Sequence, residues 1–348
     1  FSTHQSSITV LVPSYSEETE VIRKTILSAA LQEYPDLRVV LLLDDNPFKV
    51  RPEDETRLSA TRALSTEIKE LLSEPYEHFS KALARIENPK SQSKKVTGKA
   101  VLEVAAQYMW AAEWLNDFAD KEEIEDHVDV FFANQVLREL AKDLSLVGEA
   151  LRASNEEGAT LSYERIVQLY RRLVWIFGAE ISVFERKRYV SLSHESNKAM
   201  NLNSYIGLMG GAYRQEQSPE GIILVPTTDY ESADMIIPES EFVLTLDADS
   251  VLLREYCLRL VYFLQQPDNA DVAVAQTPYS SFRGASTRLE RLSGATTDIQ
   301  HIIHQGMSHY GATFWVGANA VIRKQALEDI VEKEWVGGFE IKRYVQDR

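Results

Sequence analysis

Two continuous apolar runs near the N-terminus constrain the fold of this chain more than any other feature. The runs ITVLVPSY, residues 8–15, and DLRVVLLLDDNP, residues 36–47, lack polar alternation, as expected of strands buried on both faces. Between them, residues 17–33 place apolar side chains at helical spacing and acids in the first turn. This order predicts a right-handed βαβ unit in an open, mostly parallel α/β sheet flanked by helices.

The pattern changes over residues 53–178, where long charged segments each carry one apolar stripe. One such stripe recurs at every fourth position, at Phe132, Val136, Leu140 and Leu144. We therefore expect a large helical insertion over 53–178, between a first half of the α/β domain over 1–52 and a second half over 179–348. Its charges are typical of a solvated face, and a docking surface for a partner is the alternative.

The α/β pattern resumes after the insertion. The apolar run EFVLTL, residues 241–246, predicts a buried strand, followed by a helix over 254–265 and a strand within 270–282. A longer helix is expected over 288–311. In an open α/β sheet of this kind, ligands bind outside the carboxyl ends of the strands.

Paired aspartates follow two of the predicted strands. Asp44 and Asp45 end one strand, and Asp247 and Asp249 follow another. Parallel strands bring these ends to the same edge, where convergent carboxylates repel one another unless a cation lies between them. Oxygen ligands suit hard ions, so the pairs predict a site for Mg²⁺ or Mn²⁺. The alternative is that each pair caps the helix that follows.

Composition and motifs exclude several other classes. The net charge of −16, from 53 acidic and 37 basic residues, argues against a general nucleic-acid-binding protein. Neither the Walker A pattern nor GxGxxG occurs in the sequence. The turn PSYSEE, residues 13–18, carries acids and no glycine, so it favours contacts to a base and ribose over a backbone cradle for phosphate.

Four segments in chain order carry a family resemblance. TVLVPSYSEE, VVLLLDDNP, NKAMNLN and LTLDADS together resemble the inverting glycosyltransferases of family 2, which have the GT-A fold. The resemblance implies transfer of a sugar from a nucleotide sugar, UDP-linked, to a growing glycan with inversion. It also implies a metal cofactor, Mg²⁺ or Mn²⁺, held by the aspartates of the DxD motif, Asp247 and Asp249.

The same resemblance assigns the donor-binding residues. Lys198 and Asn201 of NKAMNLN would approach the diphosphate, with Asp247 near the donor sugar. The base and ribose of the nucleotide would be bound by residues that follow the first two strands, namely Pro13, Ser14, Tyr15, Glu17, Asp44 and Asp45.

Two later segments resemble those of cellulose-synthase-like processive enzymes. AVAQTPY would place Gln276, Thr277 and Pro278 beside the transferred sugar, and FWVGANAVIRKQAL would place Gly317, Ala318 and Asn319 at the acceptor end. The resemblance implies the catalytic domain of a membrane polysaccharide synthase at the cytoplasmic face, attached through segments outside residues 1–348. Tyr279 stands where bacterial cellulose synthases have His, and the helical insertion is longer than the family's link, so sugar and linkage stay open.

The general base implied by the resemblance is the aspartate of a TED-like segment shortly after VIRKQAL. No such segment occurs, because no Thr-Glu precedes Asp347. We therefore expect the base to follow Arg348. Two alternatives remain: a module that binds a nucleotide sugar or glycan without turnover, and a non-processive family 2 transferase.

Overall fold

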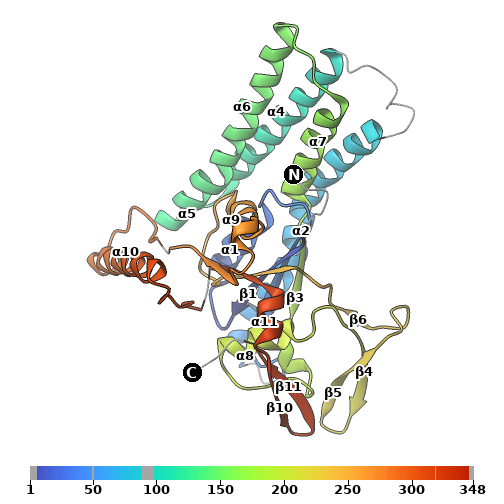
Figure 1. Cartoon of the computed structure of the whole chain (residues 1–348), viewed down its shortest axis with the longest axis vertical. Coiled ribbons are helices and arrows are strands. Elements are labelled where there is room, and N and C mark those ends of the chain that lie inside the picture. The colour runs from blue at the N-terminus through green and yellow to red at the C-terminus, as the bar shows by residue number, and fades with distance from the viewer. Residues whose placement is uncertain (1–5, 49–50, 88–97, 279, 318, 345–348) are drawn as a thin grey trace.

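The fold is built on a six-stranded, mostly parallel sheet (Figure 1). The computed structural model describes residues 6–48, 51–87, 98–278, 280–317 and 319–344. The strand order is β3-β2-β1-β7-β9-β8, and the first four strands run parallel to their neighbours whereas β9 runs antiparallel to β7 and β8. The bounds are β1 (Ile8–Ser14), β2 (Leu37–Leu43), β3 (Glu180–Phe184), β7 (Phe242–Thr245), β8 (Val274–Gln276) and β9 (Ala320–Arg323). The predicted α/β architecture is confirmed, and it is the arrangement expected of a GT-A fold.

Each face of the sheet is covered by its own helices. Along β1, Val10 and Val12 pack with helices α1 (Thr19–Ala30) and α9 (Tyr256–Leu264). Leu11, on the opposite face, packs with helices α8 (Lys198–Ile206) and α11 (Lys324–Asp329). Successive side chains of a strand alternate between faces, so an apolar run without polar alternation is buried on both sides. All seven residues of β1 are buried for this reason.

Every regular element that the structure describes between β2 and β3 is a helix. These helices are α2 (Pro52–Glu87), α4 (Gly98–Lys121), α5 (His127–Phe131), the π-helical η1 (Phe132–Arg138), α6 (Glu139–Glu156) and α7 (Tyr163–Phe177). Figure 1 shows that these helices form an elongated bundle extending away from the sheet. The predicted stripe from Phe132 to Leu144 is buried against the same core as α1. None of the described helices is long and apolar enough to cross a membrane.

The remaining elements all follow β3 in the chain. They are the antiparallel strands β4 (Ala212–Ser218), β5 (Gly221–Thr227) and β6 (Met235–Ile236), the hairpin β10 (Glu332–Val336) and β11 (Phe339–Arg343), the helix α10 (Arg288–His309), and the short 3₁₀ turns η2 (Arg186–Arg188) and η3 (Pro267–Asn269). Sequence analysis predicted α10 but neither antiparallel hairpin. The turn of the second hairpin places Gly337 and Gly338 at positive φ, as a two-residue turn between right-twisted strands requires.

A charged network ties the helical insertion to the sheet. Arg172 of α7 donates from Nε and Nη2 to both carboxylate oxygens of Glu33, at 2.9 and 2.8 Å, and from Nη2 to Asp143 of α6 at 2.5 Å. Asp143 also pairs with Arg254, in the loop before α9, at 2.9 Å. Glu33 follows α1 and is buried. The network therefore holds α6 and α7 against both halves of the α/β domain.

Removal of the Arg172 guanidinium should destabilise the whole chain. Arg172→Met leaves the buried Glu33 carboxylate without its cation, so we expect a loss of about 3 kcal/mol in the free energy of unfolding, measured in urea. The matched control is Arg171→Met, because Arg171 is 47% exposed and pairs with Glu87 on the surface. That change should cost less than about 1 kcal/mol. Equal losses in the two variants would contradict the role given to Arg172.

The same network should make stability fall in acid. Burial raises the pKa of the Asp143 carboxyl, but the hydrogen bonds and charges of Arg172 and Arg254 outweigh it and hold that pKa below its usual value. A carboxyl with a lowered folded-state pKa contributes stability above its unfolded pKa of about 3.9, and this stability is lost as pH falls through the folded pKa. Asp143→Asn should therefore lose less stability than the wild type below about pH 4 in urea unfolding. Parallel pH profiles would contradict this.

Candidate functional site

The carboxyl ends of β2, β1 and β7 meet at one edge of the sheet. Ser14 at the end of β1 pairs in register with Leu43, and the Asp44 amide donates to the Ser14 carbonyl at 2.9 Å. On the other side of β1, the Leu246 amide donates to the Leu11 carbonyl at 3.0 Å. Because β1 lies between two parallel neighbours, Asp44 and Asp247 reach the same edge from opposite sides.

A cavity of about 380 Å³ opens at this edge. Its walls contain many of the residues that the sequence predicts for donor and metal binding: Pro13, Ser14, Tyr15, Glu17, Asp44, Lys198, Asn201, Asp247 and Asp249. Ser196, Asn197 and Ala248 complete the lining. The structure thus brings together side chains from segments more than two hundred residues apart in the sequence.

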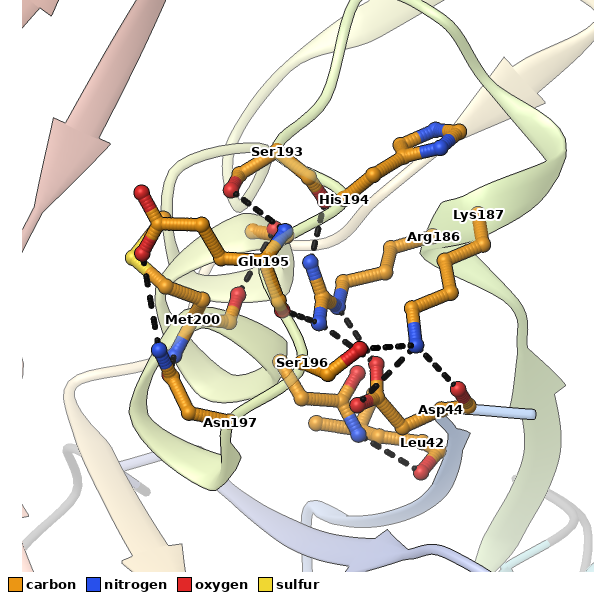
Figure 2. Close-up of polar contacts among 12 residues, drawn as sticks. Leu42, Asp44, Arg186, Lys187, Ser193, His194, Glu195, Ser196, Asn197 and Met200 are labelled. Atoms are coloured by element: carbon orange, nitrogen blue, oxygen red, sulfur yellow. Dashed lines mark hydrogen bonds and ion pairs between the residues drawn. The ribbon is translucent and has the colours of Figure 1, made fainter. Parts of the chain in front are cut away.

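A buried ion-pair cluster surrounds Asp44, one of the residues that line this cavity (Figure 2). Arg186, which is 0% exposed, approaches Asp44 Oδ1 with Nε at 2.8 Å and Nη2 at 2.6 Å. Lys187 Nζ lies 3.3 Å from Asp44 Oδ2 and donates to the Asp44 carbonyl at 2.5 Å. Burial raises the pKa of the Asp44 carboxyl, and the two cations oppose this shift. The carboxylate is thereby fixed in orientation at the end of β2.

Arg186 also shapes the loop that leads into α8. Its two terminal nitrogens donate to the backbone carbonyls of Ser193 and Glu195. Next in the chain, Asn197 caps α8, since its side chain accepts from the Met200 amide at 2.7 Å. The following residue is Lys198, so the position of its ammonium group depends on a loop held by Arg186.

Lys198 faces the DxD segment across the cavity. Its Nζ donates to Asp247 Oδ1, and Asp249 lies exposed in the same cavity. Polar side chains of α1 hold the backbone of this segment: Thr25 Oγ1 donates to the Ala248 carbonyl at 2.7 Å, and Ser28 Oγ accepts from the Leu252 amide at 3.0 Å. The two aspartates therefore lie on a loop whose backbone is held by hydrogen bonds from α1.

Charge and hydrogen-bonding capacity limit what this cavity can accept. Its lining carries the carboxylates of Glu17, Asp247 and Asp249 against the ammonium of Lys198, while the Asp44 carboxylate is paired with Arg186 and Lys187. A divalent cation would reduce the repulsion between these carboxylates and a diphosphate. Asn201 is 1% exposed and donates from Nδ2 to the Leu42 carbonyl at 2.8 Å, while its buried Oδ1 accepts from no group within the described residues. A ligand N–H or O–H would satisfy this oxygen.

The segments predicted to meet the acceptor lie next to the DxD loop. Asn319 Oδ1 accepts from the Asp247 amide at 3.4 Å, and Asn319 Nδ2 donates to Ser250 Oγ at 3.1 Å. The Tyr256 hydroxyl bonds to the Asn319 carbonyl at 2.7 Å and to Thr277 Oγ1 at 2.9 Å. Asn319 has φ of 50°, a left-handed conformation that asparagine tolerates.

Some predicted residues lie outside the cavity lining. Gln276 Oε1 accepts from the Val316 amide at 2.9 Å, and Pro278 is exposed. Gln276, Thr277, Pro278, Gly317 and Asn319 are absent from the cavity walls, and Ala318, Tyr279 and Asp347 lie outside the described residues.

Asp45, predicted to contact the nucleotide together with Asp44, also lies outside the lining. It pairs instead with Arg57 of α2 at 3.1 Å. Its contact with a base or ribose therefore stays a prediction.

Sequence reasoning missed the cations around Asp44. The run ERKR, residues 185–188, reads as a solvated charge cluster, yet Arg186 and Lys187 are buried. The signal available in the sequence was the position of this run directly after the strand AEISVF, where the carboxyl end of β3 meets that of β2. Arg57, Tyr256 and the polar residues of α1 carried no such signal, because their neighbours come from distant segments.

The Arg186–Asp44 pair should be essential for stability. Arg186→Met leaves a buried carboxylate at the end of β2, so we expect a loss of about 3–5 kcal/mol in urea unfolding. Arg186→Lys keeps the charge but lacks the planar fork, and should lose less. The matched control is Arg188→Met, because the Arg188 side chain is 47% exposed and its buried partner Glu185 keeps a two-point contact with Arg62 of α2. Equal losses in the two Met variants would contradict this role of Arg186, because they would show that Lys187 alone stabilises the buried Asp44 carboxylate.

Comparison with known proteins bears on the second half of this site. A search of curated proteins finds no match to the chain. Residues 242–347 match the model of a family described as Glycosyl transferase family group 2. The matched region begins at β7 and includes Asp247, Asp249 and Asn319. This part of the chain is therefore similar to family 2 glycosyltransferases, and the similarity supports a glycosyl transfer function.

Proposed function

We propose that this chain transfers a sugar from a UDP-linked donor to the hydroxyl of a growing glycan, with inversion. The bond between the anomeric carbon and the β-phosphate oxygen breaks, and UDP leaves. The acceptor oxygen forms the new bond from the opposite face of the sugar and gives its proton to a base. The proposal rests on one observation: Asp247, Asp249 and Lys198 line the same cavity as Tyr15 and Asp44.

The donor set of this cavity fits a divalent cation that arrives with the substrate. Within the described residues, no group of three or more His, Cys, Asp or Glu side chains is placed to hold a metal by itself. Mg²⁺ is commonly bound by one or two carboxylates together with substrate phosphates and water, so Asp247 and Asp249 suffice as protein ligands. When bound, the cation supplies positive charge against the diphosphate that departs.

The chain's own residues bind the rest of the donor. The Lys198 ammonium, on the first turn of α8, is placed to bind diphosphate oxygens once a cation neutralises Asp247. Tyr15 lies at the mouth of the cavity beside Lys187, whose Nζ is 6.0 Å from the centre of the ring. A uracil ring can stack on Tyr15, and the free Oδ1 of Asn201 accepts a hydrogen bond from the bound donor. These contacts hold the nucleotide while the sugar points toward Asn319.

We place the glycan acceptor at the segments around Thr277 and Asn319. Both bond to the Tyr256 hydroxyl, so they form one surface next to the DxD loop. Their resemblance to cellulose-synthase-like segments supports a processive polysaccharide synthase acting at the cytoplasmic face of a membrane. A module that binds nucleotide sugars without turnover is the competing proposal.

Loss of one DxD carboxylate should weaken metal-dependent nucleotide binding. In calorimetric titrations of UDP with Mn²⁺, we expect Asp249→Asn to bind about tenfold or more weakly than the wild type, since one charged contact is lost. Asp268→Asn removes the same charge from an exposed position on η3 and should bind like the wild type. Without Mn²⁺ the wild type should bind poorly.

Two results would contradict this proposal. UDP binding that is equal with and without Mn²⁺ would remove the metal from the mechanism, and no binding by the wild type would remove the donor site. Release of UDP from UDP-glucose or UDP-N-acetylglucosamine in the presence of a glycan separates the transferase from the binding module, which binds without release.

A further inference from the structure

A second cavity, of about 410 Å³, lies within the helical insertion, between α2 and α4. Its volume is within the range of about 300–1,000 Å³ typical of small-molecule sites. Its lining shares no residue with the cavity at the sheet edge. The residues of interest are two tryptophans, three acids and one lysine: Glu74, Trp110, Glu113, Trp114, Asp117 and Lys121.

The two indole rings are held in place by other aromatic rings. His78 stacks on Trp110 with ring centres 4.3 Å apart and planes 11° apart, and His78 Nε2 is bonded to Gln107 Oε1 at 2.6 Å. Trp114 meets Phe177 edge-on at 5.5 Å, and its Nε1 donates to Glu74 at 3.3 Å. Both rings are only partly buried. Rigid, partly exposed aromatic rings are suited to flat apolar ligand faces because little entropy is lost on binding.

Hydrogen-bonding groups of both kinds surround these rings. Glu113 and Asp117 are exposed, one helical turn apart on α4, and offer carboxylate acceptors, while Lys121 offers an ammonium donor.

We propose that this cavity binds a neutral oligosaccharide of pyranose rings with equatorial hydroxyls. Such rings present an apolar C–H face, which matches the indole faces, and a rim of hydroxyls, which both donate and accept hydrogen bonds. The mixture of carboxylates and an ammonium matches that rim. A small organic cation would also suit indoles and acids, and the three carboxylates outnumber the one ammonium, so the test below includes such a cation.

Glycan binding in this cavity is a function beyond the proposed donor site, and it does not depend on that site. A glycan held here would bind to the same chain that extends glycans at the sheet edge. Binding in this cavity requires neither UDP nor a divalent cation, so it should persist in Asp249→Asn. Failure of the donor site and failure of this second site are therefore distinguishable.

The test is a titration of the 348-residue chain with cellohexaose, laminarihexaose and maltohexaose, followed by calorimetry and tryptophan fluorescence. We expect at least one hexasaccharide to bind the wild type. The exposed pair Glu113→Ala and Asp117→Ala should weaken binding about fivefold or more through lost hydrogen bonds. Trp110→Phe, which keeps an aromatic ring against His78, should also weaken it.

Matched controls use the same kinds of change elsewhere. Glu103→Ala removes an exposed acid from α4 outside the cavity, and Trp335→Phe alters an exposed ring on β10; both should bind like the wild type. Tetramethylammonium chloride serves as the cation probe. Binding of this cation but of no hexasaccharide, binding of none of the probes, or hexasaccharide binding that the cavity variants leave unchanged would each overturn the proposal.

Discussion

The ion pair between Asp44 and Arg186 is the contact on which the arrangement of the candidate site depends. A fully buried guanidinium is tolerated only when its charge is paired and its N–H groups are bonded. Arg186 meets both conditions through Asp44 and the carbonyls of Ser193 and Glu195. The end of β2, the turn after β3 and the loop before α8 must therefore fit together as one unit, which sets where Lys198 stands relative to Asp247.

The helical insertion is joined to this unit by further ion pairs. Near the start of α2, Arg57 pairs with Asp45 at 3.1 Å, and Arg62 forms a two-point contact with Glu185 at 2.6 and 3.0 Å. Asp45 and Glu185 are the chain neighbours of Asp44 and Arg186. Arg172 of α7 also pairs with Glu33, which follows α1. Through these contacts the insertion helps to hold the edge of the sheet where the candidate site lies.

Much of the sheet could be predicted because burial follows a local pattern. Apolar runs without polar alternation identify β1, β2 and β7, and their parallel order brings the residues after each strand to one edge, as Asp44 and Asp247 demonstrate. The antiparallel position of β9 between β7 and β8 could not be predicted, because strand order does not follow from chain order. The hairpin of β10 and β11 was missed for another reason, since its residues are largely exposed and lack an apolar run.

The candidate site likewise has features that the sequence predicts and features that it does not. The sequence by itself determined the strands, the acids at their ends and the lysine that begins α8, because strand burial and strand ends are properties of short segments. Only the tertiary structure decided how the charges pair. Asp44 and Arg186 are 142 residues apart, and Lys198 and Asp247 are 49 apart. A run such as ERKR reads the same in solvent or in a core, and only the folded chain surrounds Arg186 with the acceptors that make its burial possible.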